Sequence, residues 1–324
     1  MLTSDQKIKI NEKVQGFKEA ADFYRMEYSQ DLMGMFRDFG CMLLLKCKVD
    51  TEGKADLERL LEGRHKLKGT VKRQLMTVSE ELAQLWEPGE QDGSGDTGEY
   101  EGSQNVREMF QTALEEIFHF CLYSKGGKNR YLLPEETAKP LLRLLTFPEG
   151  MMAGNEGLVV LDTQCGAGSA LMAASRYLKN LRLMGYEKDE EMWAAAVIMS
   201  QLSGLEMELH LEDGARADLY ESCDLVISNP VYGTDTIKDE ELIDQLPGEL
   251  KTVRGRYHME LIRSMQALNF DGKAMLIVPN SFLFANRTES MKVRKWLLQS
   301  YSLEAIISLP EDTFMYSGVR SGVM

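Results

Sequence analysis

The chain has 324 residues, 44% of them hydrophobic, with a formal net charge of −14 and a sequence pI near 4.9. This length and composition predict a sizeable core and about two domains. The acidity argues against a chain that grips nucleic acid unaided, because neutralising phosphates requires clustered Lys and Arg. The longest apolar runs, such as 41–45, are too short to span a bilayer, and the N-terminus lacks a secretion signal. We therefore expect a cytoplasmic protein without membrane contact.

The cysteines and histidines show no pattern of a disulfide framework or a metal site. Five cysteines are scattered without paired spacing, and only four histidines are present. An odd, scattered set suits free thiols in a reducing compartment. No Cys/His group has metal-ligand spacing, so we expect no bound metal.

The first part of the chain has helical periodicity and almost no strand signal. Residues 3 to about 85 alternate apolar and charged residues near a period of 3.6. The Gly-rich, acidic stretch at about 87–104 predicts a flexible loop, with an acidic interaction segment as a less favoured alternative. An amphipathic helix at about 106–123 follows. We therefore expect a helical N-terminal region over 1–126.

From about residue 157, short apolar runs alternate with helical patterns. Strands are predicted at 158–162, 181–187, 206–212, 225–228, 274–278 and 305–309, with helices at 169–178, 190–203 and one ending over 294–300. Strand–helix–strand alternation implies right-handed crossovers and a mostly parallel sheet covered on both faces. We expect one α/β domain over 127–324.

The first predicted strand runs into a glycine-rich turn, Asp162-Thr-Gln-Cys165-Gly166-Ala-Gly168. Glycines let the backbone approach a ligand where a Cβ would clash, and a helix N-terminus suits an anionic group. The three-glycine dinucleotide pattern is not present. A tight turn without a ligand is the alternative.

Acidic residues follow the next two predicted strands. Glu187 lies 19 residues after Gly168, at the end of a strand, where a carboxylate can accept both ribose hydroxyls. Asp213 follows the third strand, where it can accept the amine of an adenine ring. A solvated charge run and an ordinary Asp-Gly turn are the competing interpretations.

The fourth strand ends in Asn229-Pro230-Val231-Tyr232. An amide, a proline and an aromatic ring at a strand end can hold a planar amine between acceptors and a stacking face. This segment resembles the (Asp/Asn/Ser)-Pro-Pro-(Tyr/Phe/Trp) signature of amino-group methyltransferases, with Val231 at the second proline. The glycine turn, Glu187, Asp213 and this segment follow four successive predicted strands. That order is more specific than any one of the four features alone.

The glycine loop resembles that of S-adenosylmethionine-dependent methyltransferases, and residues from about 127 onward resemble the modification subunit of type I restriction–modification systems, an N6-adenine DNA methylase family. Segments 130–137, 271–280 and 302–314 add to the resemblance. It implies a Rossmann-like class I fold with a doubly wound sheet. It also implies S-adenosylmethionine as cofactor, bound by Asp162, Cys165, Gly166, Gly168, Glu187, Asp213, Leu133 and Pro134.

The resemblance further implies methyl transfer to N6 of an adenine flipped out of DNA. The Asn229 side-chain oxygen and the Pro230 carbonyl would accept the amine hydrogens, and Tyr232 would stack on the base. DNA would be read with a separate specificity subunit. This sequence departs from the family pattern at Val231, Thr163 and Leu133.

Two other functions remain open. The same kind of loop serves methylation of protein glutamine and of ribosomal RNA amino groups. A catalytically degenerate methyltransferase fold that acts as a binding subunit is the third interpretation, and Val231 favours it. The family's sheet usually continues beyond a segment such as 316–324, so we expect a chain truncated at this end.

Overall fold

The computed structural model describes residues 2–27, 32–49, 59–60, 67, 69–86, 100–124, 132–145, 157–219, 223–230, 232, 235–314 and 319–324. The chain forms two compact units. One contains residues 1–128 and 194–205, and the other contains residues 129–193 and 206–324. Residues 194–205, which the sequence places in the α/β domain, thus group with the N-terminal helices.

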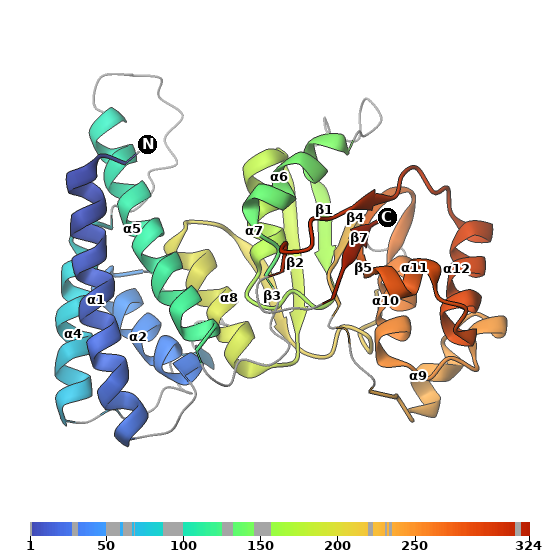
Figure 1. Ribbon diagram of the computed structural model, residues 1–324, viewed down its shortest axis with the longest axis horizontal. Helices are drawn as coiled ribbons and strands as arrows, with labels where there is room; N and C mark the ends of the chain where they lie inside the picture. Colours follow the sequence, from blue (N-terminus) through green and yellow to red (C-terminus); the bar gives the residue numbers. More distant parts are fainter. Residues whose placement is uncertain are drawn as a thin grey trace. The chain divides into compact units, whose positions relative to one another are not determined.

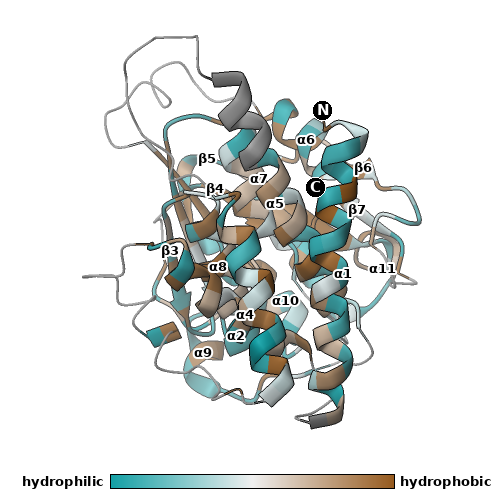
Figure 2. Ribbon diagram, turned by 90° about the vertical axis from the view of Figure 1, so that its left-hand side faces the viewer, coloured by the Kyte–Doolittle hydropathy of each residue, from teal (hydrophilic) through white to brown (hydrophobic). Residues whose placement is uncertain are grey.

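The first unit is helical. Its helices are α1 (Ser4–Glu27), α2 (Leu32–Lys46), α4 (Gly69–Ala83), α5 (Tyr100–Leu122) and the greater part of α8 (Glu190–Leu202). On α1, Ile10, Val14 and Phe17 are buried at spacings of four and three, which is one face of a helix. Figure 2 shows polar and apolar residues alternating along α1 accordingly.

Helix α2 lies at the centre of this unit, because its residues from 32 to 41 are all buried. Gly40 permits a close approach to α8, since an added Cβ would lie 2.4 Å from the Ile198 Cδ1 atom. Helix α5 begins at Tyr100, so the predicted loop is wrong over 100–104. Polar residues such as Ser and Asn are typical of loops and also of helix starts, which explains the error. Residues 87–99 of that predicted loop lie outside the described residues.

The second unit is built on a sheet (Figure 1). Its described strands are β1 (Leu158–Asp162), β2 (Leu181–Glu187), β3 (Met207–Leu211), β4 (Cys223–Ser228), β5 (Leu268–Pro279), β6 (Ile307–Ser308) and β7 (Ser321–Val323). They are arranged in the order β3-β2-β1-β4-β5-β7-β6. Neighbours from β3 to β5 pair in parallel, and β7 is antiparallel to both β5 and β6. The expected mostly parallel sheet is confirmed.

Helices and short segments connect these strands. They are α6 (Glu135–Leu144), α7 (Ser169–Tyr177), α9 (Glu240–Asp244), the 3-10 helix η1 (Gly248–Leu250), α10 (Arg256–Gln266), α11 (Asn280–Phe284) and α12 (Thr288–Ser300). The strand order runs outward from β1 in one direction and from β4 in the other. Right-handed crossovers therefore place α7 and α10 on opposite faces of the sheet. The switch point between β1 and β4 is where ligands bind in such sheets.

Strand β7 was not predicted. Ser321–Val323 pairs with Ile277–Pro279 of β5 and with β6, so this segment joins the sheet as an antiparallel strand. Among the described residues, no helix has both the length and the apolar character needed to cross a membrane.

Candidate active site

The predicted site residues meet at the carboxyl edge of the central strands. β3, β2, β1 and β4 are adjacent and parallel, so the segments that follow them lie at one edge. Asp162 ends β1, Glu187 ends β2, and Asp213 follows β3. Asn229 and Pro230 follow β4. The topology thus gathers residues that lie up to about 70 positions apart in the sequence.

The glycine turn after β1 is tied to the end of β2. The Gly166 N–H donates to the Glu187 Oε2 atom at 3.0 Å, and the Cys165 N–H donates to the Tyr186 carbonyl oxygen at 2.9 Å. Gly166 and Gly168 have φ angles of 56° and 78°, in the left-handed region that favours glycine. Gly168 is also the N-cap of α7, and as a glycine it provides no side-chain hydrogen bond to the first turn of the helix. The turn therefore presents backbone at a helix N-terminus, as the sequence predicts.

Cys165 contributes packing to this turn. Its side chain is buried, and an added Cβ on Gly185 of β2 would lie 2.8 Å from the Cys165 Sγ atom. Burial raises the pKa of the Cys165 thiol well above its ordinary value. A raised pKa favours the protonated thiol, which is a poor nucleophile, so we interpret Cys165 as a packing residue of the turn.

Two carboxyl groups near the turn are held in poorly solvated positions. Burial raises the pKa of Asp162 to about 7, although its carboxylate accepts a hydrogen bond from the Gln164 N–H at 3.0 Å. Burial also raises the pKa of Glu187, which accepts from the Asp189 N–H at 2.7 Å as well as from Gly166. A cationic ligand nearby would favour the ionised form of both groups. The site is therefore suited to a positively charged molecule.

Asp213 is paired with an arginine that the sequence analysis did not single out. The Arg256 Nη2 and Nη1 atoms lie 2.6 and 3.1 Å from the Asp213 Oδ2 atom, and Nη1 lies 3.2 Å from the Glu260 Oε1 atom. Glu260 is buried, and burial raises its pKa to about 7. Gly214 lies directly against the turn after β1, because an added Cβ would be 2.3 Å from the Thr163 carbonyl oxygen.

The segment before α6 lies beside the glycine turn. The Leu133 N–H donates to the Ser169 Oγ atom at 3.2 Å, and Pro134 is the N-cap of α6. Glu135 bonds to Arg176 and to the Tyr177 hydroxyl of α7, which holds α6 and α7 together. Leu133 thus lies beside Ser169, the first residue of α7, and the cofactor-binding roles of Leu133 and Pro134 stay predictions. Arg130 and Tyr131 of the same motif lie outside the described residues.

The Asn-Pro-x-Tyr segment follows β4, which pairs with β1 through Val160 and Leu225. The Tyr232 ring makes an edge contact with the Tyr257 ring, with centroids 5.6 Å apart and an interplanar angle of 71°. Tyr257 in turn contacts Phe282 with centroids 5.9 Å apart. Aromatic packing therefore fixes one side of Tyr232. Val231, the departure from the family signature, lies outside the described residues.

Helix α10 supplies the residues that sequence reasoning missed. Arg256, Glu260 and Ser264 are spaced by four, so they lie on one helix face. Ser264 Oγ lies 2.5 Å from Thr163 Oγ1, in the turn after β1. The signal was available as three polar residues at helical spacing among apolar ones, but the partners of Arg256 and Ser264 outside the helix lie 43 and 101 positions away. No local pattern points to such partners.

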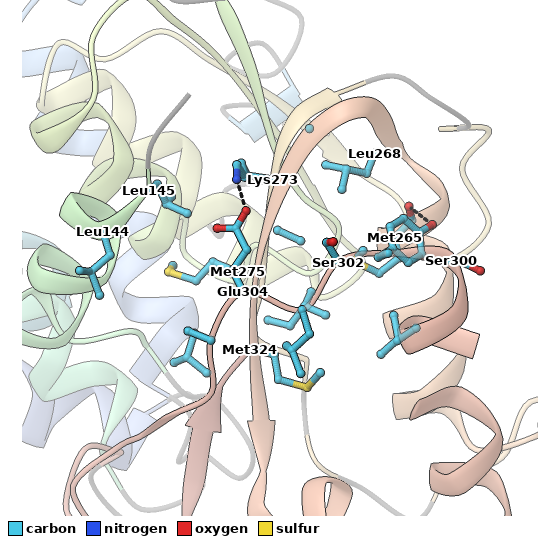
Figure 3. Close-up of a pocket in the computed structure, with 18 of the residues that line it drawn as sticks. Leu144, Leu145, Met265, Leu268, Lys273, Met275, Ser300, Ser302, Glu304 and Met324 are labelled. Carbon is cyan, nitrogen blue, oxygen red and sulfur yellow. Dashed lines mark hydrogen bonds and ion pairs between the residues drawn. The ribbon is translucent and has the colours of Figure 1, made fainter. Parts of the chain in front are cut away.

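A separate cavity of about 360 Å³ lies in the second unit, along the first half of β5 (Figure 3). Its lining is mostly apolar, with the ion pair of Lys273 and Glu304 at one side. None of the predicted site residues lines this cavity. The described residues also contain no group of three or more His, Cys, Asp or Glu side chains that could hold a metal ion.

This sheet order and the glycine turn at its switch point define a class I S-adenosylmethionine-dependent methyltransferase fold. A Listeria monocytogenes structure assigned to that class matches with a TM-score of 0.66 and 18% identity, over 97% of this chain and 86% of that one. The type I restriction–modification methyltransferase subunit from Streptococcus thermophilus matches with a TM-score of 0.61 and 16% identity, over 97% and 84%.

The chain belongs to the N-6 DNA methylase family, whose model matches residues 107–324. It is 24% identical to the type I restriction enzyme MjaVII methylase subunit of Methanocaldococcus jannaschii, over 83% of this chain and 46% of that protein. It is 27% identical to the type II restriction enzyme and methyltransferase RM.BcgI of Heyndrickxia coagulans, over 51% and 27%. The chain thus spans less than half the length of these curated relatives. The predicted family and fold are confirmed.

Proposed function

We propose that this chain is the catalytic module of a DNA methyltransferase that transfers a methyl group from S-adenosylmethionine to N6 of adenine. One observation carries the proposal. The glycine turn, Glu187, Asp213 and the Asn229-Pro230 segment follow four adjacent parallel strands, at the edge where such sheets bind ligands. Membership of the N-6 DNA methylase family supports the same assignment.

The residues present fit the proposed cofactor. S-adenosylmethionine carries a sulfonium and an ammonium, and it supplies an electrophilic methyl group when bound. Asp162, Glu187 and Glu260 are poorly solvated acids whose ionised forms a cation would stabilise. Gly166 and Gly168 have positive φ angles and no Cβ, so a bound cofactor could approach the backbone of this turn closely. Glu187 would accept from the ribose hydroxyls and Asp213 from the adenine amine.

The target amine is a poor nucleophile because its lone pair is delocalised into the adenine ring. Two acceptors aimed at its N–H bonds favour a more tetrahedral nitrogen, which frees that pair for attack. We assign these roles to the Asn229 side-chain oxygen and the Pro230 carbonyl oxygen. Tyr232, held by Tyr257, would stack on the flipped base. In this mechanism the rate comes chiefly from positioning and preorganised acceptors, without a strong general base.

Sequence recognition on DNA would come from a separate specificity subunit. The net charge of −14 gives the chain little general attraction for a phosphate backbone. Two of its relatives are described as subunits of type I restriction–modification enzymes. The proposed partner is therefore a DNA-binding protein that supplies the net positive charge needed for contact with phosphates, since the 37 Lys and Arg residues of this chain are outnumbered by 51 Asp and Glu residues.

The test is tritiated methyl transfer from S-adenosylmethionine, with unmethylated DNA, ribosomal RNA and protein extract as parallel substrates. Each assay is run with and without the proteins encoded beside this chain. We expect label in DNA, and more label when the neighbouring proteins are added. Label confined to RNA or protein would contradict the proposal, as would failure to bind S-adenosylmethionine at millimolar concentration.

A further inference from the structure

Helix α10 presents a polar stripe to the turns after β1 and β3. The stripe consists of Arg256, Glu260 and Ser264, and each of these side chains has a bonding partner. Arg256 bonds to Asp213 and Glu260, and Ser264 bonds to Thr163. Glu260 and Ser264 are buried, and the Arg256 side chain is 23% exposed. The proposed function assigns no role to Arg256 or Ser264, and it uses Glu260 only as a poorly solvated acid.

The contact between Arg256 and Asp213 is unequal at the two carboxylate oxygens. Oδ2 receives both guanidinium nitrogens, at 2.6 and 3.1 Å. Oδ1 receives only longer bonds, from Arg256 Nη1 at 3.3 Å and from the Ala215 N–H at 3.3 Å. A carboxylate oxygen has two lone pairs, and long bonds leave an acceptor open to a better donor. Arg256 therefore holds Oδ2 in place, and Oδ1 stays available as an acceptor for a ligand.

Glu260 holds the guanidinium in place from the other side. Its Oε1 atom lies 3.2 Å from Arg256 Nη1, one helical turn along α10. Because the guanidinium is planar, two carboxylates on the same fork restrict its rotation. Arg216 also approaches Asp213, at 3.9 Å, but it bonds to Asp239 as well and is 57% exposed. Arg256 is thus the arginine that sets the orientation of the Asp213 carboxylate.

We infer that Arg256 is a positioning residue that fixes Asp213 to select a cofactor carrying a 6-amino group on its purine. The inference rests on the proposed function, in which Asp213 accepts from the adenine amine. A purine with a 6-oxo group would place an oxygen against Oδ1 and be rejected. A carboxylate free to rotate would lose part of this discrimination, because it could turn away from the unfavourable oxygen.

The experiment compares the affinities for S-adenosylhomocysteine and S-inosylhomocysteine, whose purines differ in the group at position 6 and in the proton that the 6-oxo form carries on N1. Both are measured by titration calorimetry on the full chain. We expect the wild type to prefer the amino form by roughly tenfold or more, the scale of one hydrogen bond to a charged group. In Arg256→Met the preference should fall to about threefold or less. Arg256→Lys keeps the positive charge but loses the two-nitrogen contact of the guanidinium, so it should give an intermediate ratio of the two affinities.

Arg254→Met is the matched control. This arginine lies two positions away, and its Nη1 atom donates to the carbonyl oxygens of Lys251 and Val253. The ratio of the two affinities in Arg254→Met should equal that of the wild type. A loss of folding would weaken both ligands equally and leave the ratio unchanged, so the ratio separates positioning from stability. Asp213→Asn calibrates the assay, because an amide can donate to a 6-oxo group and should reduce the preference.

The outcomes distinguish this inference from the function on which it rests. An unchanged ratio in Arg256→Met, with a reduced ratio in Asp213→Asn, would overturn the role of Arg256 and leave the proposed cofactor site intact. Absence of binding of either ligand to the wild type at millimolar concentration would overturn both. A reduced ratio in Arg254→Met as large as that in Arg256→Met would also overturn the inference.

Discussion

Gly214 sets how closely the turns after β1 and β3 can approach. An alanine Cβ at this position would lie 2.3 Å from the Thr163 carbonyl oxygen and 2.9 Å from the Tyr186 Cβ, well inside the 3.4 Å at which ordinary contact begins. The obstacles are backbone and the root of a side chain, so neither can swing aside. Thr163 is further fixed by Ser264 at 2.5 Å. Gly214→Ala must therefore push apart two walls of the proposed cofactor pocket.

We expect Gly214→Ala to destabilise the fold by about 2–3 kcal/mol, at the upper end for overpacking. That corresponds to a melting temperature lower by roughly 4–12 °C. The affinity for S-adenosylmethionine should fall as well, because Asp213 is displaced with the turn. The matched control is Gly248→Ala, where an added Cβ meets nothing within 4 Å. Thermal denaturation and calorimetric binding measure both effects. If Gly214→Ala melts and binds like Gly248→Ala, the argument from close packing is wrong.

Further predictions concern protons, a buried arginine and the thiols. Burial raises the pKa of Asp162 and of Glu260 to about 7, so both acids are partly protonated at pH 6.5. Binding of cationic S-adenosylmethionine should therefore release protons, and its affinity should increase as the pH rises through 7. Equal calorimetric heats in buffers of different ionisation enthalpy would contradict this. Arg263→Met should cost about 2–4 kcal/mol in chemical denaturation, because Arg263 donates to two buried carbonyl oxygens; a neutral effect would refute that role. The five cysteines are all buried, so a thiol reagent should label none in minutes without denaturant and all five with it. Rapid native labelling of Cys165 would show that its turn is open.

The sequence predicts the first half of the sheet well because its signals there are local. Strands 158–162 and 181–187 have the predicted bounds, since each is an apolar run closed by an acid or glycine. Strand β5 begins at Leu268, six residues before the predicted start, because Asn, Asp and Gly interrupt its apolar pattern. Strand β7 has three residues, and its pairing with β5 carries no local signal.

The candidate site likewise contains some residues that local sequence signals predict and others that they do not. Gly166 and Glu187 could be placed together from sequence, because the ends of neighbouring parallel strands meet, and the structure bonds them at 3.0 Å. Arg256 could not be found, since its partner Asp213 lies 43 positions away and helix α10 was not predicted. The roles of Asn229, Pro230 and Tyr232 in methyl transfer remain predictions.

In the proposed mechanism, the Asn229-Pro230 segment directs methyl transfer to the amino group of adenine. The most direct measurement is mass spectrometry of nucleosides from unmethylated DNA that has been incubated with the chain, its neighbouring proteins and S-adenosylmethionine. We expect N6-methyl-2′-deoxyadenosine with the wild type and none with Asn229→Ala, which should still bind the cofactor. N6-methyl-2′-deoxyadenosine formed at wild-type levels by Asn229→Ala, or methylation at another base alone, would contradict it.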